Sequence, residues 1–275
     1  MSIKEYAKQR LADLVFSLYR TGILKMKHEI RVMTIDETID ELLDTKKSLV
    51  RFGDGEIAMM RGVSLTLQKE VPELTERLKE ILTFPDDDLL VAVQEIFTDL
   101  NDFIPKSQRF WKDHLLVCRK YYERYCNPDR IYRSARFSRC YATVADRSRC
   151  RERFDRIAQI WRDQDVVVVE GEESRTGEGN DLLDQARSVE KILGPARNAY
   201  DEYDRILADC RKKPKDRLFL LALGPCAKPL AEDLFRAGYR VIDIGNLNNE
   251  YNWFLAGVTD KDNAKPETVP QSDQK

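Results

Sequence analysis

The run Asp165-Val166-Val167-Val168-Val169 decides the fold class of this 275-residue chain. Four consecutive β-branched residues favour a strand. A strand without polar residues on either face must be covered on both sides, as the strands of parallel sheets are. The run from Leu218 to Leu223, Leu-Phe-Leu-Leu-Ala-Leu, has the same character. The two runs together predict an α/β protein with a mostly parallel sheet.

Strands and helices are predicted to alternate outward from these two runs. Strands are expected at 48–53, 89–94, 165–170, 217–223 and 240–245. Apolar residues at helical spacing predict helices at roughly 72–83, 151–162, 181–193, 199–212 and 226–237. This alternation is typical of a Rossmann-like, doubly wound sheet. We assign the sheet to residues 34–258 and expect the polar residues 259–275, with two prolines, to be a disordered tail.

Residues 1–33 are expected to form a helical extension before this domain. Apolar side chains recur at helical spacing at Ile3, Ala7, Leu11, Leu14, Val15 and Leu18. One interpretation is a helix that packs on the core, or on a second copy in a homodimer. The other is a peripheral helix at the inner face of the membrane, with its basic residues at the lipid headgroups. Thr34 and Glu37 then predict a capping box at the start of a further helix.

Composition excludes several classes of protein. The net charge of −2 and the pI of about 5.9 argue against a general polyanion binder, and no nucleic-acid-binding motif is present. No apolar run approaches the ~20 residues of a membrane helix, and charges interrupt the N-terminus too often for a signal peptide. Six cysteines without a C-x-x-C spacing predict buried, reduced thiols in a cytoplasmic protein. Two histidines are too few for a histidine-rich metal site, so any metal would be a hard cation bound by oxygen ligands.

Residues 119–162 are strongly basic, with 12 Arg and one Lys against five acidic residues, and tyrosines lie among them. One interpretation is a solvated helical face whose Arg stems pack on aromatic rings. The other is a wall that faces nucleotide phosphates, an acidic glycan or a lipid surface. We expect two or three of these arginines to contact ligand.

The hexapeptide Arg51-Phe52-Gly53-Asp54-Gly55-Glu56 lies where the first strand of the domain ends. In extended backbone, residues two apart point the same way, so Asp54 and Glu56 are expected to converge on one cation. Gly53 and Gly55 remove side-chain bulk, so that a metal-bound diphosphate can approach closely. We expect these glycines and Arg51 to contact that ligand.

A second motif, residues 170–181, directly follows the strand at 165–169. Ligands of open α/β sheets bind beyond the carboxyl ends of strands. The two glycines of this motif form either a tight turn or a phosphate cradle at the N-terminus of the helix expected next. Its Arg is expected to bind the same phosphates, and its last two residues to cap that helix. The candidate residues are Arg175, Gly177, Gly179, Asn180 and Asp181.

The third motif is a strand, Gly224-Pro225, a helix, and a strand that ends near Asp243. Asp243 lies 19 residues after Gly224, a spacing similar to that of the acidic residue that binds a ribose in dinucleotide folds. The G-x-G-x-x-G fingerprint is missing, which disfavours an NAD enzyme. The helix start at 226 is still available for an anion.

The segment 246–254 is rich in Asn and also contains Glu250. Glu250 is a candidate general base, and the asparagines are candidates for binding sugar hydroxyls. The alternative is a polar turn that Trp253 and Phe254 anchor to the core.

Together, the three motifs resemble the GT-D-fold glycosyltransferases, a bacterial family long described as a domain of unknown function. The resemblance runs from about Val32 to Leu255 and includes Glu37-Thr38-Ile39 and Ser138-Arg139-Cys140-Tyr141, the latter similar to the family's Thr-Arg-Pro-Tyr. It implies transfer of a sugar from a nucleotide-sugar donor, typically a UDP-hexose. The implied acceptor is a glycan or glycoconjugate in surface polysaccharide or glycoprotein assembly.

The resemblance also implies a divalent metal, Mn²⁺ or Mg²⁺, bound by an Asp-x-Glu motif whose positions here are Asp54 and Glu56. Such a cation stabilises the negative charge of the departing diphosphate as a Lewis acid. Glu250 matches an acidic position in the family's Glu-Tyr-x-Trp stretch. This match makes Glu250 the candidate that accepts the proton of the acceptor hydroxyl.

The chain departs from the family's pattern at a few positions that cluster where the acceptor or the donor sugar is expected. Asn246 stands where the family usually has His, and Asn248 and Asn252 stand where it has acids. Cys226 replaces a usual Thr, and Cys140 replaces Pro. One alternative is therefore a non-catalytic nucleotide- or glycan-binding module on the same fold. Another is an NAD(P)-dependent oxidoreductase.

Overall fold

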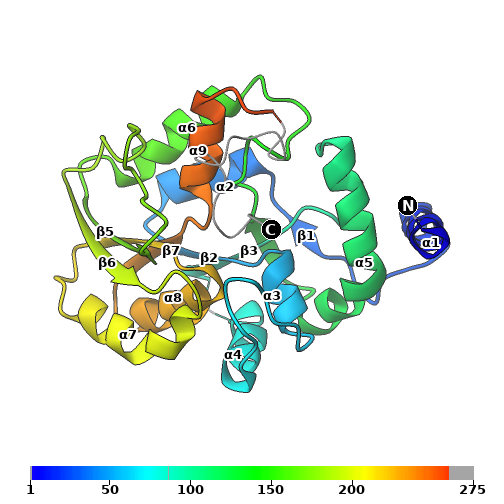
Figure 1. Cartoon of the computed structure of the whole chain (residues 1–275), viewed down its shortest axis with the longest axis horizontal. Coiled ribbons are helices and arrows are strands. Elements are labelled where there is room, and N and C mark those ends of the chain that lie inside the picture. Colours follow the sequence, from blue (N-terminus) through cyan, green and yellow to red (C-terminus); the bar gives the residue numbers. More distant parts are fainter. Residues whose placement is uncertain (1, 86, 260–275) are drawn as a thin grey trace.

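The computed structural model describes residues 2–85 and 87–259 and contains one sheet of eight strands (Figure 1). The strand order is β1-β4-β3-β2-β8-β7-β5-β6, and every pairing between these strands is parallel. The strands are β1 (Arg31–Val32), β2 (Ser48–Arg51), β3 (Leu89–Val93), β4 (Ile131–Ser134), β5 (Asp165–Gly171), β6 (Ser188–Gly194), β7 (Leu218–Ala222) and β8 (Arg240–Asp243). The predicted parallel α/β sheet is therefore confirmed.

Helices cover both faces of this sheet. The α-helices are α1 (Ile3–Arg20), α2 (Ile35–Asp44), α3 (Asp54–Met59), α4 (Pro72–Leu82), α5 (Pro105–Tyr125), α6 (Cys150–Ala158), α7 (Tyr203–Arg211), α8 (Ala227–Arg236) and α9 (Leu247–Leu255). Short 3₁₀ helices are η1 (Gln159–Trp161), η2 (Ala199–Glu202) and η3 (Gly224–Cys226). Figure 1 shows α2, α6 and α9 on one face and α4, α7 and α8 on the other, as in a doubly wound fold.

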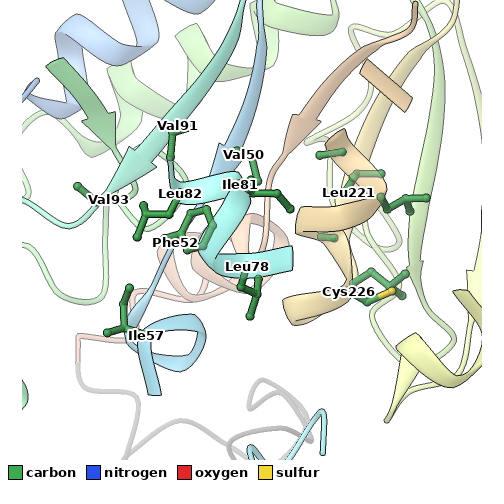
Figure 2. Packing of buried hydrophobic residues seen from close by; sticks show 14 of the residues in the cluster. Val50, Phe52, Ile57, Leu78, Ile81, Leu82, Val91, Val93, Leu221 and Cys226 are labelled. Atoms are coloured by element: carbon green, nitrogen blue, oxygen red, sulfur yellow. The ribbon is translucent and has the colours of Figure 1, made fainter. Parts of the chain in front are cut away.

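The valines of β5 divide between two hydrophobic clusters because successive side chains of a strand point to opposite faces. Val166 and Val168 pack in the cluster that contains residues of α2, α6 and α9. Val167 and Val169 pack in the cluster that contains residues of α4, α5, α7 and α8. Figure 2 shows part of this second cluster around the ends of the central strands. The prediction that the valine run forms a strand buried on both faces is confirmed.

The helix predicted at 181–193 is wrong. Residues 181–187 form turns, and Ser188–Gly194 is the edge strand β6, which pairs with β5 along its whole length. Glu190 and Lys191 lie in the middle of this strand and lower its apolar content, because an edge strand buries less of its surface. Pairing with β5 therefore outweighs the local preference of residues 188–194 for a helix. The edge strand β1 and its neighbour β4 were also not predicted.

The segment 246–254 is mostly the helix α9. The sequence did not predict a helix here, and one interpretation was a polar turn. Its buried side chains include Leu247, Tyr251 and Trp253, which face the cluster beneath α2 and α6. Leu247 and Tyr251, at i and i+4, lie on one side of the helix and Trp253, at i+6, lies on another, so the pattern is burial around most of the helix. The number of Asn residues hides that pattern in the sequence.

The predicted N-terminal helix is confirmed as α1, which packs beside α5 at the edge of the molecule (Figure 1). The predicted capping box of α2 also forms: Glu37 N–H donates to Thr34 Oγ1 at 3.2 Å, and Thr34 N–H donates to Glu37 Oε2 at 2.8 Å. Arg31 and Val32 pair with β4, so the end of the helical extension belongs to the sheet. No helix within residues 2–85 and 87–259 is long and apolar enough to cross a membrane. The tail predicted at 259–275 lies, except for Thr259, outside the described residues.

Candidate active site

A cavity of about 430 Å³ lies at the carboxyl ends of β2, β5, β6, β7 and β8. This edge is where open α/β sheets bind their ligands. The residues that line it after these strands lie within 51–56, 171–176, 195–199, 222–228 and 245–249. Segments far apart in the sequence therefore meet at one site, as the three motifs predicted.

The hexapeptide 51–56 lines the cavity, but its backbone is not the predicted extended turn. The helix α3 begins at Asp54, and Glu56 Oε2 accepts a hydrogen bond of 2.7 Å from the N–H of Gly53. This bond closes the first helical turn, so Asp54 and Glu56 do not point the same way as they would in a strand. Both carboxylates still lie at the cavity and at a helix N-terminus, where negative charge is stabilised.

Glu56 is part of a buried charge network beneath the cavity. Lys228, at the start of α8, lies 2.8 Å from Glu56 Oε1 and 3.2 Å from Asp243 Oδ2. Asp243 Oδ2 also accepts from the backbone N–H of Arg51 at 3.2 Å, and Asp243 Oδ1 accepts from that of Gly245 at 3.1 Å. The network ties β2, β8, α3 and α8 together.

The protonation states of this network follow from its pairings. Burial opposes the charge on Glu56, yet Lys228 and the Gly53 N–H hold the Glu56 pKa below its ordinary value. Burial also opposes the charge on Lys228, but the carboxylates of Asp243 and Glu56 raise the Lys228 pKa. Glu56 and Lys228 are therefore an ionised pair at neutral pH.

Gly245 is required by the guanidinium of Arg51. A Cβ at residue 245 would lie 2.0 Å from Arg51 Nη1, and the residue has a φ of +47°. Any other residue would displace Arg51, whose Nε donates to the carbonyl of Ala135 at 2.9 Å. The close approach of the Arg51 guanidinium to the backbone of residue 245 explains why a glycine follows β8 at this position.

Asp243 is fully buried inside the network and does not line the cavity. Its position at the end of β8 is as predicted, but Lys228 and two backbone N–H groups already contact its carboxylate. The structure therefore gives Asp243 no direct access to a ribose. Gly224 does line the cavity with a φ of +54°, and the predicted helix start after it is confirmed by η3 and α8.

Glu250 is also fully buried and lies behind the cavity surface. Its Oε2 accepts hydrogen bonds from the N–H groups of Tyr141 and Ala142, at 3.1 and 2.8 Å. Its Oε1 lies 3.8 Å from Nε of Arg139, which does line the cavity. Burial raises the Glu250 pKa. In this geometry Glu250 positions the segment 139–142 and does not line the cavity.

The second motif is a loop without the helix that was expected after it. Glu173, Ser174 and Thr176 line the cavity. The five candidate residues, Arg175, Gly177, Gly179, Asn180 and Asp181, do not. The predicted phosphate cradle at a helix N-terminus is therefore wrong, because the chain passes through turns into β6.

Asn180 and Asp181 instead attach this loop to α9. Asn180 Nδ2 donates to Asn248 Oδ1 at 2.9 Å and to Asn252 Oδ1 at 2.8 Å. Asp181 accepts from the hydroxyl of Tyr251 at 2.7 Å. Two of the Asn residues that depart from the family's pattern thus form an amide cluster with Asn180.

Several cavity residues were not among the predicted site residues: Thr66, Gln68, Arg139, Arg197 and Lys228. The loop with Thr66 and Gln68 is held by Asn198, whose N–H donates to the carbonyl of Leu67 at 2.7 Å. Arg197 was hidden because the strand before it was predicted as a helix. Lys228 could have been found from the sequence, since it lies four residues after Gly224 in the first turn of a predicted helix.

The basic segment 119–162 acts mostly as an ordinary helical surface. Arg149 and Arg153 pair with Asp36 of α2, at 2.7 and 2.9 Å, and these arginines hold the Asp36 pKa below its ordinary value. Arg136 and Arg151 lie over the aromatic rings of Phe103 and Phe254. Among the described residues of the segment, Arg139 alone lines the cavity, fewer than the two or three ligand contacts expected.

The described residues of the cavity supply too few ligands to bind a hard cation alone, so phosphate oxygens of the substrate would have to supply the remaining ligands. In the part of the chain that the structure describes, no group of three or more His, Cys, Asp or Glu could hold a metal ion. Asp54 and Glu56 both line the cavity. Mg²⁺ commonly binds one or two carboxylates together with phosphate oxygens and water. The two carboxylates fit such a set, and all six cysteines are buried and free, which leaves no thiolate site.

Comparisons of sequence agree on one family. A family model described as the glycosyltransferase GT-D fold matches residues 49–271. A probable glycosyl transferase of Streptococcus gordonii is 39% identical over 250 residues, 90% of this chain and 36% of that protein. The glycosyltransferase GlyD of Streptococcus pneumoniae serotype 4 is 36% identical over 258 residues, 94% of this chain and 32% of that protein. The chain spans about a third of the length of these relatives.

Solved structures agree as well. A glycosyltransferase from Streptococcus sanguinis superposes with a TM-score of 0.84 at 38% identity, covering 89% of this chain and 93% of that one. A domain described as having a distinct glycosyltransferase fold superposes with a TM-score of 0.83 at 35% identity. That match covers 94% of this chain and 87% of the other.

Proposed function

This chain belongs to the GT-D glycosyltransferase family, and we propose that it transfers a sugar from a nucleotide-sugar donor, a UDP-hexose, to a glycan or glycoconjugate acceptor. The observation that carries the proposal is that one cavity is lined both by the acidic residues Asp54 and Glu56 and by the cationic residues Arg139, Arg197 and Lys228. A diphosphate needs cationic groups, and a metal bound to that diphosphate needs carboxylates. One cavity with both suits a metal-bound nucleotide diphosphate.

The donor diphosphate is proposed to lie over Gly224 and the start of α8. The helix N-terminus carries partial positive charge, and Lys228 adds a full charge in its first turn. Arg197 and Arg139 also line the cavity, in the segments that follow β6 and β4. These groups stabilise the negative charge that develops as the nucleotide leaves.

Asp54, with Glu56 beside it, is proposed to hold Mn²⁺ or Mg²⁺. When bound, such a cation supplies Lewis-acid stabilisation of the leaving diphosphate. Glu56 also keeps its pair with Lys228, since each carboxylate oxygen can accept more than one contact. Asp54 is the half-buried member and has the more open approach from the cavity.

The acceptor is proposed to enter beside Asn246 and Asn249, which line the cavity after β8. Their amides can donate to and accept from sugar hydroxyls. We place the reaction in the cytoplasm, in surface polysaccharide or glycoprotein assembly. The amide cluster of Asn180, Asn248 and Asn252 supports this side of the cavity by fixing the loop that carries Ser174 and Thr176.

A donor screen tests the proposed function. UDP-, GDP-, CMP- and dTDP-sugars are added with and without Mn²⁺, and the melting temperature is measured. We expect a UDP-hexose with Mn²⁺ to raise it most, and we expect UDP release in the presence of acceptor to require Mn²⁺ or Mg²⁺. Binding without turnover across a broad acceptor panel would favour the non-catalytic binding module. A response to NAD or NADP, with none to nucleotide sugars, would contradict the proposal.

Glu250→Gln is expected to keep sugar transfer within a few-fold of the wild-type rate. The Gln carbonyl can accept the N–H groups of Tyr141 and Ala142, and Glu250 Oε1 has no hydrogen-bond partner to lose. Because the Glu250 pKa is raised in the folded protein, the ionised carboxylate lowers stability above the unfolded pKa. The variant should therefore be at least as stable at pH 7, with the gain fading toward pH 4. Steady-state kinetics and urea unfolding at both pH values measure this.

Glu250→Ala serves as the comparison for this variant. It leaves two buried N–H groups without an acceptor, which costs about 1–3 kcal/mol for each. A general base would behave differently: its removal by Gln typically costs a factor of about 10²–10⁴ in rate. A loss of that size in Glu250→Gln, with unchanged unfolding, would restore the catalytic role inferred from the sequence.

A further inference from the structure

A second hollow, of about 600 Å³, lies on the α1 side of the molecule, away from the candidate active site. Its walls are the end of α1, the segment that follows α1, the loop 97–101 and Arg119 of α5. Figure 1 shows α1 beside α5 at the edge of the fold. Among the described residues, the two hollows share none of their lining.

Arg119 is the unusual residue of this second hollow. Its side chain is only 6% exposed, and its guanidinium carbon lies 3.8 Å from the ring centroid of Tyr19. Its Nε and Nη1 have no hydrogen-bond partner. Within the described ranges it forms no ion pair with a carboxylate, whereas Arg109 on the same helix pairs with Asp13 and Asp113.

A buried guanidinium whose donors lack partners is energetically costly, and the carboxylate of Glu123, four residues later on α5, acts on Arg119 only through space. Burial lowers the Arg119 pKa, although arginine stays protonated. Stacking on Tyr19 offsets part of the cost, because the ring face attracts cations. The remaining donors are unsatisfied, and buried polar groups in folded proteins almost always have partners. An anion in the hollow would supply the missing partner.

Other groups of the hollow agree with an anion. His28 Nε2 is buried there and also has no partner. Arg20 and Lys25 line the same space, as do the acidic residues Glu29 and Asp99. Asp99 Oδ1 already accepts from the N–H of Asn101 at 2.9 Å.

We propose that this hollow binds a phosphate group, with Arg119 as the central donor. A guanidinium presents paired N–H groups that match phosphate oxygens, and His28 and Lys25 can contribute further donors. The volume exceeds that of a phosphate alone, and Leu24, Met26 and Phe97 give part of the wall an apolar character. The ligand is therefore a phosphate attached to an organic group.

The phosphate has two sources: a soluble phosphate ester or the headgroup of an anionic phospholipid. The helix α1, whose end lines the hollow, and the turn that follows it expose large apolar side chains, with exposed fractions of 51% for Leu11, 57% for Leu14 and 71% for Ile23. These side chains suit the acyl region of a membrane surface. The experiment therefore includes one arm for each source.

The test compares the wild-type chain with Arg119→Met and Arg124→Met. Arg124 is the matched control, since it lies on the same helix over Tyr125, is exposed and does not line the hollow. The Nε–H signal of Arg119 in NMR spectra, assigned by its loss in Arg119→Met, is followed during titration with inorganic phosphate and with pyrophosphate. Co-sedimentation with phosphatidylcholine vesicles, with and without phosphatidylglycerol, is measured in parallel at matched ionic strength.

We expect phosphate or pyrophosphate to shift the Arg119 signal in the wild type and in Arg124→Met. If the source is lipid, phosphatidylglycerol vesicles will retain these two proteins at least tenfold more than Arg119→Met. Without ligand, Arg119→Met should unfold at the wild-type denaturant concentration or above it, since a charge without a partner is removed. An unmoved Arg119 signal together with equal vesicle binding of all three proteins overturns the proposal.

Discussion

Asp54→Asn is expected to abolish sugar transfer while the melting temperature stays close to that of the wild type. Asp54 lines the cavity at the first position of α3, where its carboxylate is proposed to bind the metal of the donor complex. Asn keeps the shape but loses the charge, and the loss of several kcal/mol of transition-state stabilisation corresponds to roughly a thousandfold in rate or more. The fold should persist because Asp54 is only half-buried.

The measurements are kcat/KM with saturating Mn²⁺ and calorimetric titration of Mn²⁺ in the presence of UDP. Asp204→Asn is the matched control, because Asp204 lies in the first turn of α7, is exposed and does not line the cavity. We expect the control to keep both activity and metal affinity. Near-wild-type turnover of Asp54→Asn would exclude the proposed metal role of Asp54.

Lys228→Met is expected to lower the free energy of unfolding by roughly 3–5 kcal/mol, the usual cost of removing one partner of a buried ion pair. Lys228 is 4% exposed, and its Nζ contacts Glu56 at 2.8 Å, Asp243 at 3.2 Å and the carbonyl of Gly224 at 3.1 Å. Its removal leaves Glu56 without a cation in a buried site. Urea unfolding at pH 7 measures the loss.

The difference in free energy of unfolding between the wild type and Lys228→Met should decrease as the pH falls. In the wild type the Glu56 pKa is depressed, so this group stabilises the fold above its unfolded pKa and loses that effect as the pH falls through the folded pKa. Without Lys228 this stabilisation is absent, so the two proteins differ most at neutral pH. The double variant Lys228→Met, Glu56→Gln should recover part of the loss.

Lys212→Met is the control for this experiment. Lys212 pairs with Asp209 at 2.8 Å, but its side chain is 73% exposed, and such surface pairs contribute little. We expect no appreciable change in unfolding for this variant. A loss in Lys228→Met no larger than that of the control would show that the network beneath the cavity does not stabilise the fold.

The central strands could be predicted because their signal is local. The valine run at 166–169 and the apolar run from Leu218 form strands that are buried on both faces. A strand buried on both faces has an unbroken run of apolar residues in the sequence. The edge strand β6 could not be predicted in this way, since one side of it lacks a neighbouring strand. Its identity depends on pairing with β5, which is a contact between distant residues.

The candidate site was predicted in part. The hexapeptide 51–56 and Gly224 do line the cavity, since the carboxyl ends of parallel strands meet at one edge of the sheet. Asp243 ends β8 and Glu250 lies in α9, which follows that strand, yet both side chains are buried and do not line the cavity. The direction of a side chain at the end of a strand depends on its packing partners, which the local sequence does not contain.

The sequence by itself determined the parallel α/β sheet, the order of most of its elements and the family, because apolar periodicity and motif order are properties of the chain. The tertiary structure alone decided which polar groups share the cavity and which are paired beneath it. Lys228 meets Glu56 although the two are 172 positions apart in the sequence, and Asn180 meets Asn248 although they are 68 positions apart. These pairings stabilise buried charge and polarity only after the sheet has brought the segments together, since hydrogen bonds and ion pairs act over a few ångströms in space.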